Sequence, residues 1–213
     1  VDIDIVCPPG TDVISYLEPY AEEYGFGEIV PTERISRNNV PKTHAKCYYQ
    51  VSYITNTASE KILLDVLFEE NWYNQIDSLP ITSPFLQMAG EEYNVNLPSK
   101  DDLLGDKLTA YAPNTTGIPY TKRVTRKDGT IEERDCSMEI IKQLFDIASL
   151  FDKIDNLSIV RDTFLKIAPI ELEYRGMDRN NIQSILDDIY ATSLLICTGL
   201  YTKNVSEDYT RLT

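Results

Sequence analysis

The chain has 213 residues, of which 42% are hydrophobic, so it can form one large domain or two small ones around a real core. Its formal charge of −14 repels polyanions and excludes non-specific nucleic-acid binding by bulk charge. No stretch reaches the ~20 apolar residues of a membrane span, and the four scattered cysteines form neither a zinc motif nor a disulfide pattern. We therefore expect a cytoplasmic protein with reduced thiols.

The first part of the chain predicts strands around one helix. Residues 2–6 alternate in polarity like a β-strand, and residues 11–26 have the apolar spacing of a helix. Residues 28–36 predict a further strand. Residues 45–55 and 61–70 are rich in β-branched, leucine and aromatic side chains, which predicts an antiparallel hairpin.

The remainder of the chain predicts mostly helix. In chain order we expect short strands and loops (71–98), a helix (99–111), a hairpin (121–134) and three amphipathic helices (136–154, 158–175 and 178–201). Ser99 is the expected N-cap of the first helix, and Asp128-Gly129 the expected hairpin turn. The composition changes near Pro98, so we expect two domains, an α+β domain at 1–98 and a helical domain at 99–213.

Three aspartates on predicted strands are candidate metal ligands. Strand alternation places Asp2 and Asp4 on one face, which is either a solvent-facing side of an edge strand or half of a cation site. Asp65 lies in a run that predicts a strand buried on both faces, where a carboxylate needs a salt-bridge partner or a metal ion. Three oxygen donors without histidine or thiol suit Mg²⁺ or Mn²⁺. The one histidine, His44, is expected to lie in a loop and to be an ordinary residue rather than a general base.

Two charged residues on predicted helices have more than one interpretation. Helical periodicity places Lys107 inside an apolar arc, so it either extends its stem to solvent or reaches a carboxylate or a nucleotide phosphate. On the segment 138–154, Asp146 falls on the polar, solvated side, opposite an apolar side formed by Ile141, Leu144, Phe145, Ala148 and Phe151.

The predicted hairpin at 121–134 holds the densest basic cluster of this acidic chain, which consists of Lys122, Arg123, Arg126 and Lys127. One interpretation is a solvated hairpin whose cations are partnered by Glu132 and Glu133. The other is a flexible grip on a triphosphate or an RNA backbone, since arginine and lysine bind phosphate well.

These motifs together resemble a known family. The acids of residues 1–5, followed by Leu64-Asp65-Val66, resemble the metal triad of the DNA polymerase beta-like nucleotidyltransferase superfamily. The segments DDLLGDKLTAYAPNTTGIPY and IIKQLFDIASLFD resemble the second half of the AbiEii/AbiGii-type nucleotidyltransferase toxins. The family pattern there is Lys-Leu-x-Ala and a basic-x-x-aromatic-Asp helix, which correspond to residues 107–110 and 142–146. The resemblance covers most of the chain.

The resemblance implies a fold, an activity and roles for residues. It implies an α+β, nucleotidyltransferase-like mixed sheet followed by a C-terminal helical bundle, in a toxin of a bacterial toxin–antitoxin or abortive-infection system. Such toxins transfer a nucleotide from an NTP; some relatives bind GTP and some modify tRNA, and a cognate antitoxin is usual. The resemblance assigns both metal ions to Asp2 and Asp4, the completion of that site to Asp65, phosphate contact to Lys107 and the positioning of the cleft to Asp146.

The sequence departs from the family pattern at two points. The Gly-Ser or Gly-Gly pair that cradles the triphosphate precedes the Asp-x-Asp strand in the family, whereas this sequence starts at Val1, so we expect further residues upstream. An acid that the family often has before the aromatic-Asp pair is replaced by Gln143. Two alternatives therefore stay open beside an active enzyme, namely a non-catalytic nucleotide-binding or interaction protein of the same fold, and a phosphotransferase.

Overall fold

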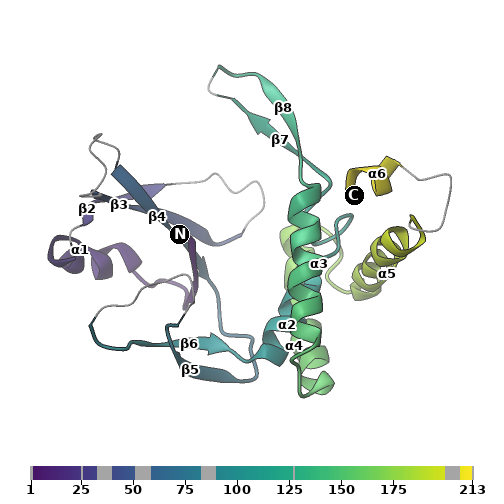
Figure 1. Cartoon of the computed structure of the whole chain (residues 1–213), viewed down its shortest axis with the longest axis horizontal. Helices are drawn as coiled ribbons and strands as arrows, with labels where there is room; N and C mark the ends of the chain where they lie inside the picture. The colour runs from purple at the N-terminus through teal and green to yellow at the C-terminus, as the bar shows by residue number, and fades with distance from the viewer. Residues whose placement is uncertain are drawn as a thin grey trace. The chain divides into compact units, whose positions relative to one another are not determined.

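The computed structural model describes residues 2–24, 26–32, 40–50, 59–82, 90–126, 128–199 and 207–212. By internal contacts the chain divides into two compact units, Val1–Asn71 and Trp72–Thr213. Both contain helices and strands, so the α+β class is confirmed (Figure 1). None of the helices in the described ranges is both long and apolar enough to cross a membrane.

The first unit contains a four-stranded mixed sheet with the strand order β1-β4-β3-β2. Its strands are β1 (Asp2–Cys7), β2 (Phe26–Thr32), β3 (Lys42–Gln50) and β4 (Ser59–Phe68). β4 pairs antiparallel with β3 and parallel with β1. The predicted first strand and the predicted antiparallel hairpin are therefore confirmed, while the hairpin loop, residues 51–58, lies outside the described residues.

One helix, α1 (Val13–Glu23), packs its apolar side against this sheet. The buried centre of the core comes from β3 and β4, and it consists of Ala45, Leu64 and Val66. The alternate β4 residues, including Asp65, point to the other face and are only partly buried. The expectation that β4 is buried on both faces is therefore wrong, because α1 covers the Leu64 side and the Asp65 side keeps contact with solvent.

The second unit begins with an antiparallel strand pair, β5 (Ile76–Pro80) and β6 (Asn94–Pro98), that leads into α2 (Lys100–Ala110). Ser99 is the N-cap of α2, as predicted, since its Oγ accepts a hydrogen bond from the Asp102 amide at 3.1 Å. A second pair, β7 (Thr121–Thr125) and β8 (Ile131–Asp135), confirms the predicted hairpin, and Gly129 supplies the positive φ of its turn. This hairpin projects from the start of the following helix (Figure 1).

The rest of the second unit is helical. Its helices are α3 (Ser137–Phe151), α4 (Leu157–Tyr174), α5 (Ile182–Gly199) and the unpredicted α6 (Glu207–Leu212). One core cluster gathers residues of α2, α3, α4 and α6, and it consists of Leu104, Tyr111, Ile140, Ile147, Val160 and Leu212. A second cluster joins α4 and α5 and consists of Ala112, Phe164, Ala168, Leu172 and Ile185.

The buried side of α3 differs from the predicted one. Ile140, Gln143 and Ile147 are buried, whereas Phe145 is 70% exposed. The predicted apolar side is right in part, because Ile141 and Leu144 pack against the core, whereas Phe145 and Phe151 are exposed. As a result, Gln143 lies inside the unit and its neighbour Asp146 is half-buried.

The division between the two compact units, after Asn71, falls earlier in the sequence than the expected boundary near Pro98. The Asp102 carboxylate on α2 explains the difference, because it accepts hydrogen bonds from the Asn74 amide at 2.8 Å and the Gln75 amide at 3.0 Å. Residues 74 and 75 are thereby bonded to the second unit. The assignment of 1–98 and 99–213 as domains stays a prediction.

Candidate active site

Two of the three candidate metal ligands lie directly opposite each other in the first unit. In the parallel register of β1 and β4, Asp4 pairs with Asp65. Neighbouring strands are only about 4.8 Å apart, and like charges directly opposite destabilise a sheet. Asp4 is exposed and Asp65 is partly buried. The pair is therefore an acidic position that a cation would stabilise.

A lysine that the sequence analysis did not single out contacts this position. Lys42 begins β3, and its Nζ lies 3.6 Å from Oδ2 of Asp65. Both alternatives for Asp65 thus have support, since it has a salt bridge with a lysine and an aspartate opposite it on the next strand. Lys42 was missed because the strand was expected to begin at residue 45. For the same reason the loop expected at His44 is wrong, because His44 lies within β3 with its Cα opposite that of Asp65.

The predicted metal triad stays a prediction. Asp2 lies in β1 with its Cα opposite that of Leu63, and its side chain is outside the described part of the chain. Among the side chains that are described, no three histidine, cysteine, aspartate or glutamate groups lie close enough together to hold a metal ion. The donor chemistry does fit, because the opposed carboxylates of Asp4 and Asp65 are the oxygen ligands that Mg²⁺ and Mn²⁺ prefer.

The second unit brings together Lys107 and Asp146, the two other candidate site residues. Nζ of Lys107 lies 3.3 Å from Oδ2 of Asp146 and 3.4 Å from Oε1 of the buried Gln143. Lys107 therefore reaches a carboxylate, which is one of the alternatives for a lysine in an apolar arc. The placement of Asp146 on a solvated face is wrong, because α2 and α3 pack together and direct Lys107 towards it. Since an ammonium group has three donors, these two contacts leave one for a further oxygen.

A neighbouring carboxyl, that of Asp106, was not predicted. Burial raises the pKa of Asp106, although a hydrogen bond from the Tyr73 hydroxyl at 2.9 Å and the nearby Lys107 ammonium act in the opposite direction. The sequence signal was weak, because an acid one turn after Asp102 on a helix is ordinary for a solvated face.

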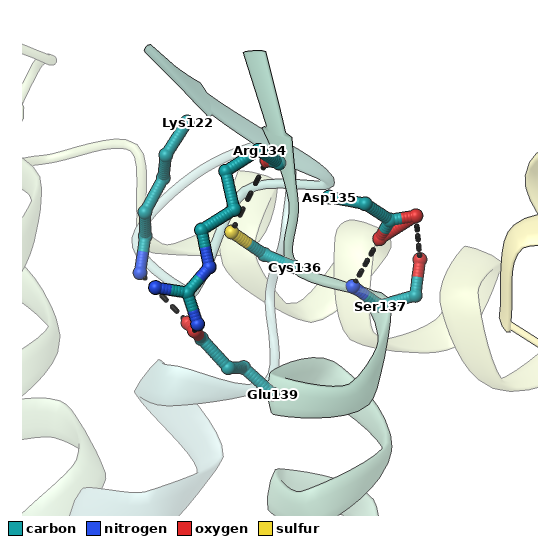
Figure 2. Close-up of polar contacts among 6 residues, drawn as sticks. All are labelled: Lys122, Arg134, Asp135, Cys136, Ser137 and Glu139. Atoms are coloured by element: carbon teal, nitrogen blue, oxygen red, sulfur yellow. Dashed lines mark hydrogen bonds and ion pairs between the residues drawn. The ribbon is translucent and has the colours of Figure 1, made fainter. Parts of the chain in front are cut away.

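The basic cluster lies on the exposed β7–β8 hairpin. At the base of the hairpin, Lys122 and Arg134 both point to Glu139 on the first turn of α3 (Figure 2). Nζ of Lys122 lies 2.8 Å from Oε2 of Glu139, and this hydrogen bond is the main cause that lowers the pKa of Glu139. Asp135 accepts a hydrogen bond from the Ser137 amide at 2.6 Å and so fixes the start of α3.

The arginines nearer the tip are also paired. Nη2 of Arg126 lies 2.6 Å from Oε2 of Glu132, and Nε of Arg123 lies 3.7 Å from Oε1 of Glu133. These contacts support the interpretation of a solvated hairpin with glutamate partners. Lys127 lies outside the described residues, and a grip of this hairpin on phosphate stays a prediction.

A comparison with protein-family models agrees with the resemblance of the motifs. The family model described as "Nucleotidyl transferase AbiEii toxin, Type IV TA system" matches residues 1–193. The solved structure of JHP933 from Helicobacter pylori is similar at 12% identity with a TM-score of 0.39, over 99% of this chain and 76% of that one. None of the curated proteins matches. The match over most of its length shows that the chain belongs to the AbiEii family of nucleotidyl transferase toxins of type IV toxin–antitoxin systems.

Proposed function

We propose that this chain is a metal-dependent nucleotidyltransferase that acts as a cytoplasmic toxin and has a cognate antitoxin. In the proposed reaction a hydroxyl group of RNA, with tRNA as the first candidate, or of a protein attacks the α-phosphorus of an NTP such as GTP. The new bond joins the hydroxyl oxygen to that phosphorus, and pyrophosphate leaves. The observation that carries the proposal is the direct opposition of Asp4 and Asp65 on parallel strands, in a member of this family.

The carboxylates of the first unit have two roles in this proposal. Asp2, Asp4 and Asp65 would hold Mg²⁺ or Mn²⁺, which neutralises phosphate charge and activates the attacking oxygen when bound. Asp65 would also accept the proton of the attacking hydroxyl. Lys42, whose Nζ lies 3.6 Å from Oδ2 of Asp65, offsets part of the charge of this carboxylate before the substrate binds.

Lys107 is the proposed phosphate contact of the second unit. Its ammonium is fixed by the Asp146 carboxylate and by the uncharged Gln143 oxygen, so these three side chains carry no net charge together. Asp146 therefore acts as a positioning residue for Lys107.

A transfer assay tests the proposal. The purified protein is incubated with Mg²⁺, total tRNA and each [α-³²P]NTP in turn, and label on RNA or protein is measured. Asp65→Asn should lower labelling by about 100-fold or more, as expected for the loss of a proton acceptor, and Lys107→Met should weaken it through KM. The exposed carboxylate just beyond β4 gives a matched control, Glu70→Gln, which should label like the wild type.

Other outcomes of the assay identify the alternatives. Label that is transferred only from [γ-³²P]NTP shows a phosphotransferase, and nucleotide binding without any labelling shows a non-catalytic binding protein. Equal labelling by the wild type and Asp65→Asn contradicts the proposed role of the carboxylates. Inducible expression of the same variants in a bacterium tests the toxin role, since growth should slow with the wild type and Glu70→Gln but not with Asp65→Asn.

A further inference from the structure

Three tyrosines form an exposed row along α1 and the turn that follows it. Tyr16, Tyr20 and Tyr24 follow each other at four-residue spacing, so they lie on one helix face. They are 74%, 48% and 62% exposed, and successive ring centroids are 6.4 Å apart with the rings tilted. The amide of Tyr24 donates to the carbonyl of Tyr20 at 3.0 Å, which continues the helical turn to the third tyrosine.

Other residues of α1 supply its contacts with the core of the first unit. Val13, Ile14 and Leu17 pack against the sheet, and the three tyrosine rings lie exposed beside them. Single exposed apolar residues are normal, but a contiguous aromatic patch marks an interaction site in many proteins. Tyrosine is also enriched among the residues that dominate binding energy at protein interfaces.

The charge around the row restricts the kind of partner. Residues 1–33 contain eight aspartates and glutamates and no lysine or arginine. Asp12, Glu18 and Glu23 are exposed on or beside α1. A surface of this kind repels nucleic acid and attracts cationic segments, because complementary charge steers association.

Arginine combines the two properties that this surface selects. Its planar guanidinium stacks on aromatic faces and donates hydrogen bonds to carboxylates at the same time, whereas lysine offers a compact point charge. We propose that the tyrosine row of α1, together with Asp12, Glu18 and Glu23, docks an arginine-rich segment of a partner protein. This inference does not depend on the proposed nucleotidyl transfer.

The test compares two peptides of equal length and charge on the whole chain. Fluorescence anisotropy measures the affinity for a labelled Arg-Ser repeat peptide and for the matching Lys-Ser peptide. We expect about tenfold tighter binding of the arginine peptide, from cation–π contacts with more than one ring. Tyr16→Ala, Tyr20→Ala and Tyr24→Ala together should remove this preference and leave the weaker, salt-sensitive binding of both peptides.

Two controls separate stacking from folding and from general aromatic content. The triple Tyr→Phe variant keeps the rings and should keep the preference for arginine. Tyr190→Ala removes a tyrosine that is 69% exposed on α5 and should change nothing. Equal affinity of the wild type for the two peptides overturns the proposal. So does tight binding of a single-stranded RNA oligonucleotide that the triple alanine variant loses, which would make the row a base-stacking surface.

Discussion

Asp102 and Asp106 lie one turn apart on α2, and the pKa values of their carboxyl groups are shifted in opposite directions. Burial alone would raise the pKa of Asp102, but hydrogen bonds from Thr163, Asn74, Ser99 and Gln75 outweigh it and lower the pKa. Asp106 has the single hydroxyl of Tyr73 within hydrogen-bond distance in the contacts described, and there burial prevails. The number of donors therefore decides whether a buried carboxylate stabilises this helix.

This contrast predicts that Asp→Asn substitutions at the two positions change the free energy of unfolding differently. At pH 7, Asp102→Asn should lower the free energy of unfolding by about 2–3 kcal/mol, because an amide replaces an acceptor that buried donors require. Asp106→Asn should leave the free energy unchanged or raise it, because it removes a charge that burial disfavours and keeps an acceptor for Tyr73. Urea unfolding of both variants measures the difference, and equal destabilisation by the two substitutions would contradict the argument.

The pH dependence of the free energy of unfolding provides an independent test of this contrast. The folded-state pKa of Asp102 is lowered, so its contribution is complete above the unfolded-state pKa of about 3.9 and disappears as the pH falls through the folded-state value. The folded-state pKa of Asp106 is raised, so its penalty is present above that value and is relieved as the pH falls towards about 3.9. In acid, Asp102→Asn should therefore destabilise the protein less than it does at pH 7. Any stabilisation by Asp106→Asn should likewise become smaller.

At the scale of elements, α2 and α4 of the second unit pack closely against each other. A Cβ atom added to Gly105 would lie 2.5 Å from the carbonyl oxygen of Val160 and 2.9 Å from Cβ of Thr163. Backbone atoms form part of this contact, so the helices can accommodate a methyl group only by moving apart. The same separation would stretch the hydrogen bond between Thr163 and Asp102.

Gly105→Ala should therefore destabilise the protein, against the ordinary helix preference. Alanine in place of glycine within a helix normally gains about 1 kcal/mol. Here overpacking should reverse the sign and cost about 1–3 kcal/mol. Thermal unfolding followed by circular dichroism measures the change, with the exposed α3 substitution Lys142→Ala as a control that should stay near the wild type. A rise in the unfolding midpoint of Gly105→Ala would show that α2 and α4 are not held this closely.

Local signals in the sequence predicted most of the elements, whereas they did not predict several contacts between elements. Ser99 and Asp128-Gly129 mark a helix start and a turn through chemistry confined to neighbouring residues, and both predictions are confirmed. The contact of Lys42 with Asp65 depends on the register of β3 against β4, which no local pattern gives. Hydrophobic periodicity also assumes that large apolar side chains are buried, and the exposed Phe145 violates this assumption on α3.

At the scale of the whole molecule, the second unit contains everything that its core requires. Both of its hydrophobic clusters consist of residues beyond Trp72. Its buried carboxylates are likewise partnered from within, since Asp102 bonds to Asn74 and Gln75, and Asp188 accepts the Asn114 amide at 2.8 Å. By contrast, the first unit buries few apolar side chains in its described part, and small cores are marginal.

Two fragments distinguish the observed division from the expected boundary near Pro98. Residues 72–213 should fold alone and unfold in one cooperative transition, because they keep both clusters and all described donors to Asp102. Residues 99–213 keep the clusters but lose Asn74 and Gln75, which leaves the buried Asp102 carboxylate with fewer donors. That loss should cost at least about 2 kcal/mol, or roughly 8 °C in the unfolding midpoint. Differential scanning calorimetry compares the fragments, and Asp102→Asn in the longer one should reproduce much of the difference. Equal midpoints would instead place the boundary of the folding unit near Pro98, because the bonds to residues 74 and 75 would then contribute nothing to its stability.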